Sequence, residues 1–121
     1  LRLGALCLES GRADSAVVHF QRATEIDPNR PDADNNLGVA YQKQGQEALA
    51  MEAWQRALSR DPDYADAHKN IGDAHLLKGR TEEAIHAYET AIRINPRHAQ
   101  AQQGLGVARL KQQMEAEGKV P

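Results

Sequence analysis

Glycine and proline recur along this chain at one fixed spacing, and that spacing constrains the possible folds more than any other feature. Two series of glycines advance in steps of 34 residues, namely Gly4, Gly38, Gly72 and Gly106, and Gly11, Gly45 and Gly79. Proline follows the same step at positions 28, 62 and 96. This regularity indicates an internal repeat, and it predicts a fold in which similar units stack on one another.

Each period is expected to form two helices. The apolar and small residues recur at helical spacing over 31–44, and 46–60 carries an apolar side made of Ala50, Met51, Trp54, Ala57 and Leu58. Gly45 and Gly79 should end the first helices, because glycine readily takes the left-handed conformation that closes a helix. Asp61 should end a second helix, because the residue before proline is pushed out of helical space. The short loops predict antiparallel neighbours.

Small and aromatic side chains share the same period. Alanine recurs in two columns and an aromatic residue in a third, at Ala16, Ala50 and Ala84, at Ala23, Ala57 and Ala91, and at Phe20, Trp54 and Tyr88. Alanine, together with the glycines at 38, 72 and 106, should let neighbouring backbones approach closely, with one aromatic ring filling the remaining volume. One helix pair cannot cover its own apolar face, so the pairs should stack into a solenoid.

The second period resembles the tetratricopeptide repeat in its pattern of Leu37, Gly38, Tyr41, Ala50, Trp54, Ala57 and Pro62. The resemblance extends over nearly the whole chain and implies an all-α fold, a right-handed α–α superhelix of antiparallel helix pairs. A single domain over 1–121 would then contain a partial unit, two full units and a final partial unit, at 1–30, 31–64, 65–98 and 99–118.

The two ends of the array differ from its middle. Gln102 and Arg109 occupy places that should face inward, which predicts that the last helix, about Ala99 to Glu117, is a solvating cap with Gly118 as its stop. The first residues present Leu1, Leu3 and Leu6 without a preceding helix to cover them. We expect the chain to be cut from a longer array, and a natural end or a homo-oligomer contact through these leucines are the alternatives.

One face of each first helix lies opposite the residues expected in the core, and the resemblance implies that these faces line a concave groove for an extended peptide. Its candidate binding residues are Asp32, Asn35, Asn36, Val39, Lys43, Asp66, Lys69, Asn70, Asp73, Leu77, Gln103, Val107 and Lys111. Leu76 and Leu110 are expected to add apolar contact there. Asn36 and Asn70 are one period apart and could pair with a peptide backbone, because an amide offers both a donor and an acceptor. Polar helix surfaces duplicated by the repeat are the alternative explanation.

Family members that hold the carboxylate tail of heat-shock chaperones use Lys and Asn on one repeat, Asn on the next, and Lys and Arg on the third. The corresponding places in this chain are occupied by Leu1, Ala5, Asn36, Asp66 and Asn70. One required charge is therefore reversed. A receptor for chaperone tails is not expected.

Catalytic, cofactor and metal signals are absent or have structural explanations. Gly104 and Gly106 resemble part of a dinucleotide turn, but no strand precedes them. His68 and His75 are seven residues apart on one helix, which is too far for both to bind one metal ion. Cys7 occupies the column of Tyr41 and is expected to be a small buried residue. The Asp and Glu residues are expected on outer faces. Glu82 and Glu83, which follow Thr81, are expected at the start of a helix, where the helix dipole favours negative charge.

Composition narrows the partner classes further. The formal charge is −2 and Lys and Arg are not clustered, which argues against nucleic acid, and no apolar stretch is long enough for membrane insertion. The sequence therefore predicts a non-catalytic scaffold that binds a protein or an extended peptide, without cofactor or metal. A substrate-recruiting segment of a larger enzyme, such as a glycosyltransferase, and a self-assembling oligomer remain as alternatives.

Overall fold

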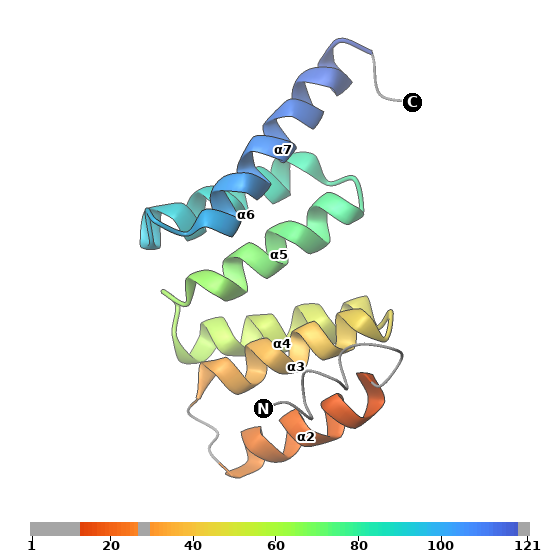
Figure 1. Cartoon of the computed structure of the whole chain (residues 1–121), viewed down its shortest axis with the longest axis vertical. Coiled ribbons are helices and arrows are strands. Elements are labelled where there is room, and N and C mark those ends of the chain that lie inside the picture. Colours follow the sequence, from red (N-terminus) through yellow and green to blue (C-terminus); the bar gives the residue numbers. More distant parts are fainter. Residues whose placement is uncertain (1–12, 27–29, 119–121) are drawn as a thin grey trace. The chain divides into compact units, whose positions relative to one another are not determined.

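The computed structural model describes residues 13–26 and 30–118, and it divides the chain into two compact units. The N-terminal unit comprises residues 1–62 and the C-terminal unit comprises residues 63–121. All regular structure in the described residues is helical (Figure 1). The expectation for Leu1, Leu3, Leu6 and Cys7 concerns positions outside the described residues.

The N-terminal unit contains the helices α2 (Ala13–Ile26), α3 (Pro31–Lys43) and α4 (Glu47–Arg60). Pro31 begins α3 at the first helical position, where its fixed φ and missing N–H cost nothing. α3 packs against both α2 and α4. The predicted helices over 31–44 and 46–60 are therefore correct to within a residue.

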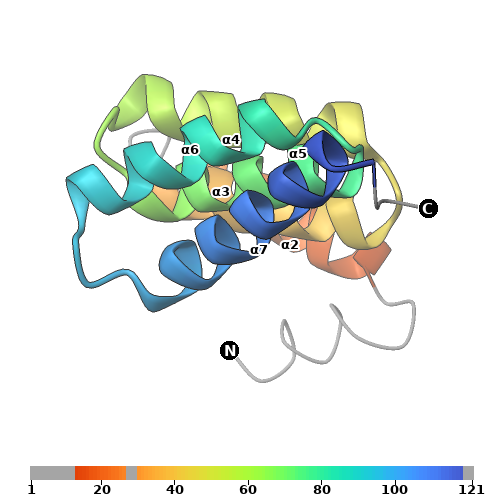
Figure 2. The same ribbon diagram turned by 90° about the horizontal axis from the view of Figure 1, so that it is seen from above.

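The C-terminal unit repeats this arrangement with α5 (Ala65–Leu77), α6 (Thr81–Ile94) and α7 (Ala99–Ala116). α6 packs against α5 and α7, and these two outer helices also contact each other. Because α6 runs antiparallel to both, α5 and α7 run in the same direction, as the two views show (Figures 1 and 2).

The helix ends follow the glycine and proline columns. Gly45 and Gly79 both have φ of +78°, the left-handed conformation that closes α3 and α5. The residues before Pro62 and Pro96, Asp61 and Asn95, are extended and end α4 and α6. The predicted stop signals are confirmed.

The last helix is longer than its counterparts. Gln113 stands one period after Gly79, so no glycine ends α7 at that place. The helix continues to Ala116, and Gly118, with φ of +70°, follows its end. This agrees with the predicted bounds of the final helix and with Gly118 as its stop.

The cores of the two units are built from the predicted columns. Trp54, Ala50 and Ala57 are at most 1% exposed in the N-terminal unit, and Tyr88 is 1% exposed in the C-terminal unit. In the C-terminal unit, Ala84, Ala91, Ala101 and Ala108 surround Tyr88. Small residues thus bring the helices together around one ring. No helix in the described part of the chain is long and apolar enough to cross a membrane.

Candidate functional site

The open face shared by α5 and α7 is organised around the ring of Tyr88, which reaches it from α6. A Cβ atom at Gly72 on α5 would lie 2.9 Å from Cε1 of Tyr88, and one at Gly104 on α7 would lie 2.5 Å from its Cε1 and Cζ. The ring is therefore held between two helices that can accept it only because both contact positions lack a side chain. This packing fixes the register of α5 against α7.

The hydroxyl of Tyr88 contacts Asp73, an acidic residue of the predicted binding face. It donates a hydrogen bond to Oδ1 of Asp73, and Lys69 Nζ lies 2.6 Å from the other carboxylate oxygen. Burial raises the pKa of Tyr88 above its usual range, and the hydrogen bond to Asp73 and the negative charge of Asp73 add to this effect. Asp73 and Lys69 are thus engaged within the protein.

A second acidic residue of this face, Asp66, is bound by a histidine. The backbone N–H of Ala101 donates to Nδ1 of His98 at 3.1 Å, which makes His98 the N-cap of α7. Its Nε2 therefore carries the proton and donates to Oδ1 of Asp66 at 2.6 Å. His98 joins the starts of α5 and α7 and was not identified from the sequence.

Three large apolar side chains are exposed on the α5–α7 face. Leu77 is 75% exposed at the end of α5, and Val107 and Leu110 are 56% and 58% exposed on α7. We call these three residues the apolar patch. Of the remaining predicted residues in this unit, Gln103 is exposed and Asn70 and Lys111 are half-buried. Leu76 differs from expectation, because it packs against the buried cluster around Tyr88.

In the N-terminal unit, α3 presents Asn36 and Lys43 exposed and Val39 half-buried. Asp32, at the start of α3, pairs with Arg30, whose Nη2 lies 2.6 Å from its Oδ2. The hydrogen bonds from Arg30 hold the pKa of Asp32 below its usual value.

Asn35 departs from the predicted face. It is only 7% exposed, and its backbone carbonyl oxygen accepts a hydrogen bond from Nε1 of Trp54 at 3.1 Å. The close packing of Trp54 against α3 covers this position. Asn35 is therefore a packing residue and not part of an open surface.

The expectation that Asp and Glu lie on outer faces is wrong for Asp34. This residue is 1% exposed, and Nε of Arg60 on α4 donates to its Oδ2. Arg56 Nε lies 3.6 Å from Oδ1, which has no hydrogen-bond partner. The pair joins α3 to α4, and sequence reasoning missed it because the arginines come from a different helix.

Family membership follows from a comparison of the sequence with family models. A model described as tetratricopeptide repeat matches residues 35–95 and 78–117, and a second model described as TPR repeat matches residues 4–45. The chain belongs to the tetratricopeptide repeat family. No curated protein sequence matches it.

Solved structures of tetratricopeptide domains share the fold. The TPR domain of Sgt2 from Aspergillus fumigatus is 24% identical, with a TM-score of 0.86 over 99% of this chain and 81% of that one. The first TPR of Spaghetti (RPAP3), bound to the HSP90 peptide SRMEEVD, is 23% identical, with a TM-score of 0.78 over 91% and 87%. MamA is 29% identical, with a TM-score of 0.76 over 98% and 67%. The predicted all-α solenoid of antiparallel helix pairs is confirmed.

Two tetratricopeptide positions do not behave as their column predicts. A Cβ at Gly106 would meet no atom within 4 Å, whereas Gly104 makes the close approach to Tyr88. The expected close approach at Gly106 is therefore wrong in this structure.

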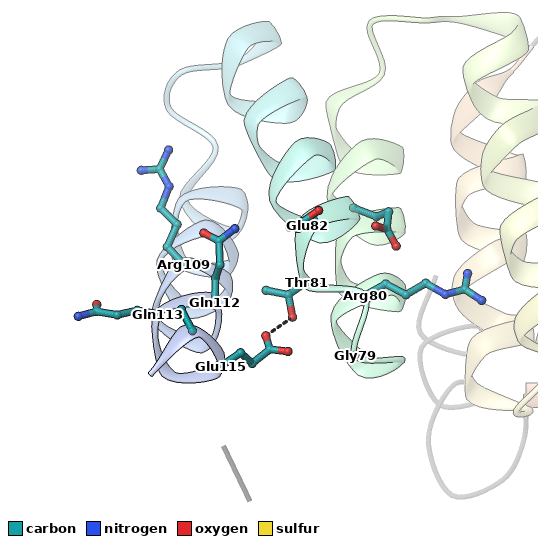
Figure 3. Close-up of a pocket in the computed structure, with 10 residues that line it drawn as sticks. Gly79, Arg80, Thr81, Glu82, Arg109, Gln112, Gln113 and Glu115 are labelled. Atoms are coloured by element: carbon teal, nitrogen blue, oxygen red, sulfur yellow. Dashed lines mark hydrogen bonds between the residues drawn. The ribbon is translucent and has the colours of Figure 1, made fainter. Parts of the chain in front are cut away.

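A hollow of about 870 Å³ lies between the start of α6 and the last turns of α7 (Figure 3). α6 begins at Thr81, with Glu82 and Glu83 in its first turn as expected, and the Thr81 hydroxyl donates to Glu115 on α7 at 2.7 Å across this hollow. Arg109 pairs with Glu89 at 3.0 Å.

Among the described residues, no group of three or more His, Cys, Asp or Glu could hold a metal ion.

Proposed function

We propose that this tetratricopeptide domain is a non-catalytic interaction module that holds an extended peptide segment of a partner protein on the open faces of its first helices. The observation that carries the proposal is the apolar patch. Leu77, Val107 and Leu110 are large aliphatic side chains left more than half exposed on two adjacent helices. Exposed apolar side chains gathered on one surface mark interaction sites more often than isolated ones do.

The rigidity of the supporting scaffold favours this function. The ring of Tyr88 and the His98–Asp66 contact lock α5 against α7, so the patch needs little ordering when a partner binds. A preorganised surface loses less conformational entropy on binding than a mobile one. The similar Spaghetti domain is bound to a peptide, which supports peptide binding as a use of this fold.

Asn36 and Asn70 would contribute backbone recognition in the two units. Asn36 is exposed on α3 and Asn70 is half-buried on α5, one period later. A side-chain amide can donate to a peptide carbonyl and accept from a peptide N–H, and it does so without selecting side chains. Sequence selectivity would then come from the neighbouring apolar residues.

The proposal is tested by selecting binders from a random dodecapeptide library displayed on phage. An enriched peptide should bind the intact chain saturably, as followed by fluorescence anisotropy. Replacing Asn36 or Asn70 by alanine, each in its own variant, should weaken the binding of a peptide held on that residue's unit by about three- to tenfold, the loss of roughly one net hydrogen bond. Glu52→Ala on α4, an exposed position away from these faces, is the control. Failure to enrich any peptide would contradict the proposal.

A further inference from the structure

The charges on the α5–α7 face are largely neutralised within the C-terminal unit. Asp73 accepts the hydroxyl of Tyr88 and pairs with Lys69 at 2.6 Å, and Asp66 accepts from His98 at 2.6 Å. A ligand carboxylate would therefore approach two existing carboxylates, while the nearby cation Lys69 is already engaged. An acidic segment would gain little charge attraction at this end of the face.

The apolar patch continues this face beyond Tyr88. Asp73 on α5 accepts from the Tyr88 hydroxyl, and a Cβ at Gly104 on α7 would lie 2.9 Å from the same oxygen. Leu77 follows Asp73 by four residues and Val107 follows Gly104 by three, which is about one helical turn in each case. Because α5 and α7 run in the same direction, Leu77 and Val107 each lie about one turn beyond the Tyr88 contact on their own helix, and Leu110 lies about one turn further along α7.

We infer that the partner segment, on the proposed function, is an uncharged extended peptide that places aliphatic or aromatic side chains on Leu77, Val107 and Leu110. Asp66, Lys69 and Asp73 are each paired within the protein, whereas the three apolar side chains have 56–75% of their surface exposed to water. Lys111, half-buried on α7, is the remaining charged residue predicted for this face in the C-terminal unit. Binding is then driven by burial of apolar area, which is non-directional and depends little on ionic strength.

This inference separates the chain from its peptide-bound structural neighbour. The peptide in the Spaghetti structure, SRMEEVD, ends in three acidic residues out of its last four. The α5–α7 face of the present chain carries the acidic residues Asp66 and Asp73, and Asp66 occupies one of the places where family members that hold chaperone tails have a cation. The two domains share a fold at 23% identity, and we assign different ligand chemistry to this one.

The test compares two variants and two peptides on the intact chain. Leu77→Ser combined with Leu110→Ser should weaken binding of a peptide enriched from the dodecapeptide library by tenfold or more, since burying one leucine contributes about a factor of ten. Val18→Ser on α2, where the replaced side chain is equally exposed at 58%, is the matched control and should change the affinity less than about twofold. Circular dichroism confirms that both variants are folded.

The enriched peptides should be apolar and their affinity should change little between low and high salt, while SRMEEVD should not bind saturably at the same concentrations. Enriched peptides that are acidic, or that dissociate on addition of salt, would overturn the inference and leave the proposed function standing. Equal binding by the Leu77/Leu110 variant would overturn it as well. If the library gives no binder, the proposed function itself fails, and this inference with it.

Discussion

The contact between Tyr88 and Gly104 shows how one missing side chain decides whether two helices can meet. The ring is fixed from three sides, by Gly72, by Gly104 and by the hydrogen bond of its hydroxyl to Asp73. A ring held in this way cannot move aside cheaply when an atom is added beside it. Glycine at 104 thus lowers the helix propensity of α7 but allows the helix to pack closely against Tyr88.

Gly104 and Gly106 form a matched pair for testing this point. Gly104→Ala should lower the free energy of unfolding by about 1–3 kcal/mol through overpacking, less any gain in helix propensity. Gly106→Ala, which meets no atom within 4 Å, should raise it by up to about 1 kcal/mol. Urea denaturation of both variants measures the difference. Equal effects of the two substitutions would contradict the packing role assigned to Gly104.

The buried carboxylate of Asp34 gives a second prediction at the scale of single residues. Arg60→Ala removes its main partner and leaves the charge almost fully buried, so the free energy of unfolding should fall by roughly 3 kcal/mol. Arg56→Ala should cost less than about 1 kcal/mol, because Arg56 is half exposed and 3.6 Å away. Denaturation followed by the fluorescence of Trp54 reports on this unit. A larger loss for Arg56→Ala than for Arg60→Ala would contradict this assignment.

At the scale of whole helices, the same pair of positions is used with different chemistry in the two units. Gln21 on α2 donates to the hydroxyl of Tyr41 on α3 at 2.8 Å. Two periods later, Arg109 on α7 donates to Glu89 on α6 at 3.0 Å. A neutral hydrogen bond is thus replaced by an exposed ion pair. This explains how Arg109 fits a column that holds a tyrosine in the N-terminal unit.

The start of α7 depends on His98, which caps the helix and contacts Asp66. His98→Ala should lower the free energy of unfolding by about 1–2 kcal/mol, of which the lost cap contributes about 1 kcal/mol. His98→Asn should recover the cap but not the contact with Asp66, because its side chain is shorter. Thermal or chemical denaturation of both variants separates the two contributions. An asparagine variant no more stable than the alanine variant would show that the cap contributes nothing.

The helix boundaries could be predicted because they depend on local chemistry. Gly45 and Gly79 adopt positive φ, and Asp61 is extended before proline, as single-residue preferences require. The burial of Asn35 and Asp34 could not be predicted, because it is decided by side chains of α4 that are 19 or more residues away in the sequence. Contacts between helices, unlike helix ends, leave no local signal.

At the scale of the whole molecule, the candidate site was predicted from the sequence as one face of the helices, but the roles of several residues on that face were not predicted. Helical periodicity alone places Leu77 and Val107 on the open side of α5 and α7, where the structure finds them exposed. It does not reveal that Lys69 and Asp73 are paired with each other, or that His98 engages Asp66. The proposed ligand chemistry of the face rests on these internal pairs, which helical periodicity does not specify.

The two units also carry separate spectroscopic reporters, which allows a prediction about pH. Trp54, the single tryptophan, lies in the N-terminal unit, and Tyr88 lies in the C-terminal unit. The pKa of Tyr88 is raised above its usual value of 10.0 in the folded protein. Below pH 10 the phenol is protonated in both the folded and the unfolded chain. Above it only the unfolded chain releases the proton, so the free energy of unfolding falls as pH rises.

This loss should reach at most about 1.4 kcal/mol per pH unit for one phenol. Urea denaturation followed by far-ultraviolet circular dichroism at several pH values between neutral and strongly alkaline measures the slope. Tyr88→Phe should be less stable at neutral pH, because Asp73 loses a hydrogen-bond donor, but its stability should fall less steeply above pH 10. Lysine and arginine titrations are common to both proteins and cancel in the comparison. Parallel slopes would show that Tyr88 ionises freely in the folded state, against the buried and hydrogen-bonded position described for its hydroxyl.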